Sequence, residues 1–106
     1  MSNEETAAAL LPSLKGFLDI TWDDPGGDAK LLGIALRGMS YVQRMTRRAL
    51  LFEEGTAERT LLFEYCRYSR SGALDEFSMN YLMELLTFQQ DEAVKAWEQG
   101  AEGGPE

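Results

Sequence analysis

The longest periodic segment of this 106-residue chain runs from about Asp75 to Trp97. Apolar side chains recur in it every three or four residues, which is the spacing of one face of an α-helix. They form two neighbouring rows, so the apolar sector is wider than packing against a small bundle usually requires. The first row is Met79, Leu82, Leu86, Gln89, Ala93 and Trp97, and the second is Tyr81, Leu85 and Phe88.

Two explanations of this wide apolar sector stay open. The surplus surface could be covered by other copies of the chain, because a homo-oligomer buries such surface simply and repeated heterologous contacts can close into rings. Alternatively, helices this short could need both rows for one core. The first explanation predicts a partner, and the second predicts a self-contained subunit.

Three earlier segments also have helical patterns. Asn3 followed by glutamates is typical of a capped helix start, and Pro12 should interrupt or restart that helix. Gly55 and Thr56 supply a turn and then a helix cap. We therefore expect an all-α fold, a small bundle of about four helices. Its expected helices cover Pro12–Asp19, residues 28–47, residues 56–72 and residues 75–97, with an extended connector between the second and the third.

Charge and hydropathy limit the possible partners. Eighteen acidic residues outweigh ten basic ones, and the net charge of −8 argues against broad attraction to phosphate. No segment approaches the roughly 20 apolar residues of a membrane helix, and the start of the chain is acidic where a signal peptide carries positive charge. We expect no membrane partner and a cytosolic site of synthesis and folding.

The residue types needed for most catalysis and metal binding are missing. The chain has no histidine and one cysteine, Cys66, which should be a small buried apolar residue. Aspartates gather around Pro25, but EF-hand spacing fails, because the twelfth position would be Lys30 or Ile34 instead of glutamate. These carboxylates should cap the next helix. We expect no catalytic residue, no cofactor and no metal, and therefore no enzyme.

Arginines recur at helical spacing in the second and third helices. Arg37, Arg44 and Arg48 are seven and four residues apart, and Glu64 precedes Arg67 by three, which suits a local ion pair. Arginine is favoured at protein interfaces because it combines an apolar stem with directional hydrogen bonds, although a solvated face has the same pattern. The candidate interface residues are Arg37, Arg44, Phe63, Arg67, Arg70, Tyr81, Leu85, Phe88 and Trp97.

Two glycines interrupt the second helical pattern. Gly33 and Gly38 each cost a helix about 1 kcal/mol relative to alanine. Either they mark places where another backbone approaches closely, or they are merely tolerated.

Several stretches together resemble the head-tail connector proteins of tailed bacteriophages, also called head-completion or DNA-packaging proteins. These are L-x-x-L-K-x-F-L-x-I near the N-terminus, the acidic turn WDDPGGD, a following helix, and LLFEYCRYSRSGALDEFSMNYLMELL. The resemblance covers about Leu10 to Val94. Its most specific parts are YCRYSRS and ALDEF-x-x-N-Y-x-x-E-L-L.

The resemblance implies a small helical structural protein of the virion neck, assembled in the host cytoplasm. Such proteins form a ring of about twelve subunits beneath the portal. Implied partners are the portal protein, neighbouring copies, a downstream neck or tail protein, and packaged DNA that passes without sequence-specific binding. The C-terminal helix and tail would approach the portal. Residues 1–97 would form the connector domain, and residues 98–106 a flexible acidic tail.

A second hypothesis is a small regulatory or DNA-binding adaptor, because short helices around a turn can imitate a helix-turn-helix. Its DNA face would consist of Arg37, Arg44, Arg47 and Arg48.

Overall fold

The computed structural model describes the backbone of residues 2–103 and the side chains of residues 2–98. Within this range it contains five helices and no strand, which confirms the all-α class with one helix more than expected. The helices are α1 (Asn3–Phe17), α2 (Pro25–Gln43), α3 (Ala57–Arg70), α4 (Leu74–Asn80) and α5 (Leu82–Gly103). Residues 98–103 of the expected tail belong to α5, and residues 104–106 lie outside the described range.

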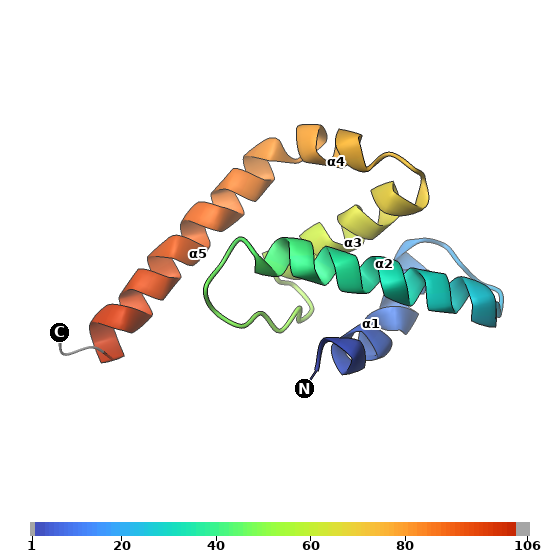
Figure 1. Ribbon diagram of the computed structural model, residues 1–106, viewed down its shortest axis with the longest axis horizontal. Coiled ribbons are helices and arrows are strands. Elements are labelled where there is room, and N and C mark those ends of the chain that lie inside the picture. The colour runs from blue at the N-terminus through green and yellow to red at the C-terminus, as the bar shows by residue number, and fades with distance from the viewer. Residues whose placement is uncertain (1, 104–106) are drawn as a thin grey trace.

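The first three helices form the bundle, in which α2 packs against both α1 and α3 (Figure 1). Helix α4 turns the chain at one end, and α5 then runs back past the connector, with its C-terminal end well away from α1. The molecule is elongated, with principal extents of 53 × 31 × 19 Å.

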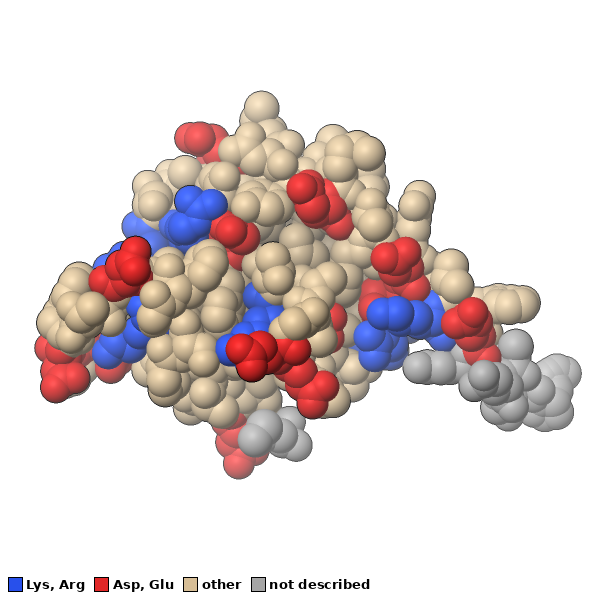
Figure 2. Space-filling model, turned by 180° about the vertical axis from the view of Figure 1, so that it is seen from behind, with Lys and Arg blue, Asp and Glu red and all other residues tan. Residues whose placement is uncertain are grey.

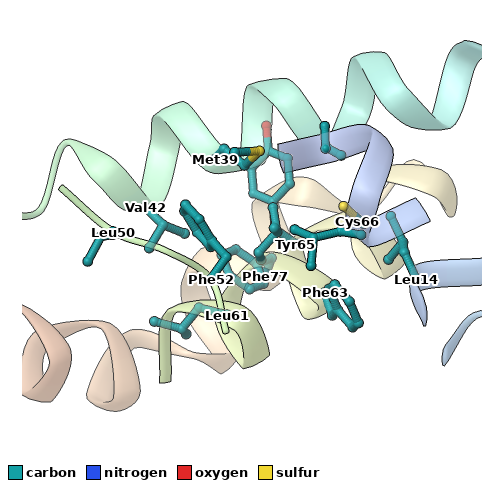
Figure 3. Packing of buried hydrophobic residues seen from close by; sticks show 14 of the residues in the cluster. Leu14, Met39, Val42, Leu50, Phe52, Leu61, Phe63, Tyr65, Cys66 and Phe77 are labelled. Atoms are coloured by element: carbon teal, nitrogen blue, oxygen red, sulfur yellow. The ribbon is translucent and has the colours of Figure 1, made fainter. Parts of the chain in front are cut away.

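The core lies where one face of each bundle helix meets the others (Figure 3). Gly38 marks the closest approach of α2 to α3, since a Cβ atom there would lie 2.7 Å from Leu62 Cδ1 and 2.8 Å from Tyr65 Cδ1. Gly33 has no such neighbour; only its own helix's Arg37 comes within 4 Å. Buried residues of the bundle include Ala7, Leu10, Leu14, Leu31, Ala35, Met39, Val42, Leu61, Leu62 and Cys66.

Helix α1 begins at Asn3 instead of Pro12 and ends at Phe17 instead of Asp19, and its cap is Ser2 and not Asn3 as expected. It begins after Ser2, whose side chain accepts a hydrogen bond from the Glu5 N–H while the Glu5 carboxylate accepts one from the Ser2 N–H. It then continues through Pro12, so the expected restart at this residue was wrong. Proline removes only one intrahelical hydrogen bond, and Leu10 and Leu14 on either side are buried in the core. Packing therefore outweighs the local preference of proline.

Helix α2 begins earlier and ends earlier than expected. The Asp24 carboxylate accepts a hydrogen bond from the Gly27 N–H at 3.1 Å, and Pro25 occupies the first turn, so the predicted aspartate cap is confirmed. The helix ends at Gln43 because this side chain folds the following segment back. Its Nε2 donates to the Arg48 carbonyl at 2.6 Å, and its Oε1 accepts from the Leu50 N–H at 3.1 Å.

Helix α3 follows the prediction closely. The Thr56 hydroxyl caps it by accepting from the Arg59 N–H at 3.3 Å, and Gly55 takes the positive φ of 85° that the preceding turn requires. The connector before it has no strand pairing and is held by the buried side chains of Leu50 and Phe52. The expected single helix over residues 75–97 is in fact two helices, divided at Tyr81.

Candidate assembly surface

The break at Tyr81 is set by an aromatic cluster that joins α2, α3 and α4 to Tyr81, the residue between α4 and α5. At its centre is Phe77, which is 1% exposed. Its ring stacks on Tyr81 with centroids 5.2 Å apart, and three further rings meet it at their edges. This cluster fixes the direction in which α5 leaves the bundle. The edge-on rings are Tyr41 at 6.0 Å, Tyr65 at 5.8 Å and Tyr68 at 5.7 Å.

The next turns of α5 are held by apolar contacts. Leu85 and Phe88 are both buried and belong to the same hydrophobic cluster as α3. The row that begins at Tyr81 therefore faces the hydrophobic core, and the neighbouring row faces away from it. Of the two rows found in the sequence, only one is used inside the subunit.

Farther along α5, a buried carboxylate binds the connector. Glu92 is 1% exposed and accepts hydrogen bonds from Arg48 Nε at 2.5 Å, Thr46 Oγ1 at 2.9 Å and Lys95 Nζ at 3.3 Å. Burial raises the pKa of this carboxyl, but the hydrogen bonds from Arg48, Thr46 and Lys95 outweigh it, so the pKa lies below its ordinary value. Glu92 is thus charged at neutral pH and fully paired.

The opposite side of α5 is apolar and open to solvent. We call this surface the α5 stripe; it consists of Leu82, Met83, Leu86, Val94 and Trp97, which are 45% to 73% exposed. Met79 of α4 extends it and is 76% exposed. The face in Figure 2 is mostly uncharged over α4 and the beginning of α5, whereas charged groups of both signs alternate over the bundle. One helix therefore has a core face and a second apolar face that no described side chain covers.

The spacing of the stripe resembles a coiled-coil seam. Met83, Gln90 and Trp97 are seven residues apart, and Leu86 and Ala93 lie between them. All five are exposed. Such a seam presents a continuous strip to another helix, with the amide of Gln90 as its single polar position.

Two of the three arginines expected on one flank of the second helix are exposed, and the third is paired inside the subunit. Arg37 and Arg44 lie exposed on the outer side of α2, beside a groove of about 470 Å³ whose walls include Tyr41 and Tyr65. Arg48 was expected on the same flank, and this was wrong, because α2 ends at Gln43 and Arg48 turns to Glu92.

On α3, Arg67 and Arg70 are exposed, and Arg67 Nε donates to Glu64 Oε1 at 2.7 Å, which confirms the predicted local pair. Phe63 was expected on this outer face but is buried. Its ring lies 5.5 Å from that of Phe17, with the Arg59 guanidinium 5.1 Å above it.

The remaining candidates belong to α5 and its start. Leu85 and Phe88 are covered by their own chain and are thus core residues rather than surface contacts, and Tyr81 is half-buried in the aromatic cluster. Trp97 is exposed. Met83 and Val94 were not included in the two apolar rows expected from the sequence. Their separation of eleven residues places them on one side of a helix. Glu92 was not included either, although it continues the row Leu85–Phe88 at a spacing of four.

The described residues give little support for a reactive thiol or a metal site. Burial raises the pKa of the Cys66 thiol to about 12, so the thiolate that acts as nucleophile or metal ligand is not formed at neutral pH. Residues 2–98 contain no group of three or more acidic, cysteine or histidine side chains placed to hold a metal ion. None of the described helices is long and apolar enough to cross a bilayer.

Comparisons with protein-family models, curated proteins and solved structures gave no match to this chain.

Proposed function

We propose that this protein is a structural virion component, a head-tail connector whose copies form a ring under the portal, extend the DNA channel and join head to tail components. The observation that carries the proposal is the α5 stripe. Its five large apolar side chains lie on a helix that is firmly anchored through its other face. Exposed apolar strips of this kind mark protein interaction sites.

Charge supports an assembly role over a DNA-binding one. The net charge of −8 suits a channel that DNA must pass without being held. In the DNA-binding alternative, four arginines would face the duplex, but Arg48 is already bound to the buried Glu92. The remaining arginines would form only a small positive surface for DNA on a protein with this net negative charge.

The test combines this protein with the portal protein of the same phage, which the genes adjacent to this one should encode. Electron microscopy of the mixture should show a ring of small subunits on one end of the portal. A Met83→Ser/Trp97→Ser variant should fold normally and fail to form the ring, whereas Leu51→Ser, which changes an exposed apolar residue of the connector, should behave as wild type. A portal that never acquires extra density would refute the proposal.

A further inference from the structure

A row of acidic residues borders the α5 stripe. Glu84, Asp91 and Glu98 are seven residues apart, which is almost two helical turns, so they follow one side of α5 at intervals of about 10 Å. All three are exposed, and no ion pair joins them to another described residue. The edge of the stripe is thus negatively charged.

The outer side of α2 has the opposite charge with the same spacing. Arg37 and Arg44 are also seven residues apart and exposed, and neither forms an ion pair within the described part of the chain. Between them lies the groove of about 470 Å³, lined also by Leu36 and Ser40. Two matching rows of opposite sign therefore occur on two different helices of one subunit.

The residues beside the arginines are small. Ala29, Gly33 and Ser40 lie on the same outward side of α2, and this is where Gly33 has no packing reason within its own subunit. Small side chains allow a second helix to approach closely, and a glycine inside a helix lowers the stability of that helix relative to alanine. The outer side of α2 therefore has room for another helix, and its positive charge is complementary to the acidic row of α5.

We infer that α5 of one subunit packs along the outer side of α2 of a second copy, with Glu84 and Asp91 facing Arg37 and Arg44 and the α5 stripe covering the small residues beside them. The two surfaces are different, so the contact is heterologous and repeats from copy to copy, which closes into a ring when the rotation permits. A symmetric α5–α5 contact would instead leave the arginines of α2 unused. This inference deepens the proposed connector role and rests on it for the expectation that copies assemble.

The decisive experiment exchanges the charges. One variant carries Arg37→Glu and Arg44→Glu, and the other carries Glu84→Lys and Asp91→Lys; all four positions are exposed, so both variants should fold. Sedimentation velocity up to millimolar concentration should show that the wild type self-associates and that each variant alone does so at least roughly tenfold more weakly. An equimolar mixture of the two variants should recover association, because each variant then meets its complement. A Glu53→Lys/Glu54→Lys control makes the same charge change on the connector as the Glu84→Lys/Asp91→Lys variant makes on α5, and it should match the wild type.

Several results would overturn the inference. A wild type that stays monomeric at millimolar concentration would do so, as would an arginine variant that associates like the wild type, which is the outcome expected of a symmetric α5–α5 contact. The inference would also be overturned if an equimolar mixture of the two variants did not recover association. Rings on the portal that both variants form normally would refute this interface and leave the connector role intact, whereas copies that associate by this interface but ignore the portal would refute the connector role alone.

Discussion

Arg48 and Glu92 are 44 residues apart in the chain, yet Arg48 Nη2 donates to Glu92 Oε2 at 3.1 Å while Nε donates to Oε1. The arginine belongs to the connector and the glutamate to α5. Gln43 in turn binds the backbone of the connector at two points, the Arg48 carbonyl and the Leu50 N–H. The end of α2, the connector and the middle of α5 are thus joined by one polar network.

Glu92→Gln should lower the free energy of unfolding by about 1–3 kcal/mol. The substitution keeps the shape but removes the charge that Arg48 and Lys95 bind, and the carboxylate is buried. Urea denaturation followed by circular dichroism measures the change. Glu64→Gln, which removes a surface pair with the half-exposed Arg67, is the matched control and should change stability by less than about 1 kcal/mol. If both variants lost the same free energy of unfolding, the buried Glu92 pair would contribute no more to stability than the surface pair.

The contribution of Glu92 should depend on pH. Its pKa is lower in the folded state than the ordinary value of 4.5, so the unfolded state binds the proton more tightly. The stabilisation is therefore fully present above that ordinary value and disappears as the pH falls through the folded pKa. Melting temperatures of wild type and Glu92→Gln should differ at neutral pH and converge in acid. A constant difference would show that the charge of Glu92 is not the cause.

The two glycines of α2 should respond in opposite ways to alanine. At Gly38 a Cβ atom would meet Leu62 and Tyr65 at less than 3 Å, so Gly38→Ala should destabilise the subunit by about 1–3 kcal/mol. At Gly33 there is room, so Gly33→Ala should stabilise the isolated subunit by about 0.5–1 kcal/mol through the higher helix propensity of alanine. Thermal melts of the two variants side by side test both signs.

Phe77→Ala should cost about 3–5 kcal/mol, because the ring is fully buried at the centre of the aromatic cluster. The break at Tyr81 depends on this cluster, so the near-ultraviolet circular dichroism of the tyrosines should change as well. Met79→Ala, two residues away and exposed, should leave the free energy of unfolding within about 0.5 kcal/mol of wild type. A mild effect at Phe77 would mean that α5 is held mainly by its later contacts.

The features that the sequence predicts well are local ones. The cap of Thr56 on α3, the cap of Asp24 on α2 and the Glu64–Arg67 pair each involve residues within three or four positions of one another. Burial of Cys66 follows from its place in the apolar face of one helix. Such features need no knowledge of the rest of the fold.

The features that the sequence could not predict depend on distant parts of the chain. Which apolar row of α5 faces inward is decided by where α3 lies, and the break at Tyr81 is decided by rings from α2 and α3. The pairing of Glu92 with Arg48 joins residues 44 positions apart, and no local pattern around Glu92 predicts it. For the same reason, Phe63, Leu85 and Phe88 were expected on the surface, although tertiary packing covers them.

Glu92 is the last buried residue of α5 among those whose side chains the structure describes, and the helix continues from Ala93 to Gly103 beyond it. At 1.5 Å per residue this segment is about 16 Å long. A tilt of about ten degrees at the Arg48–Glu92 pair would swing its tip by about 3 Å. Any force applied to the last turns of α5 would therefore be transmitted through the Arg48–Glu92 pair to the connector, and through Gln43 to the end of α2.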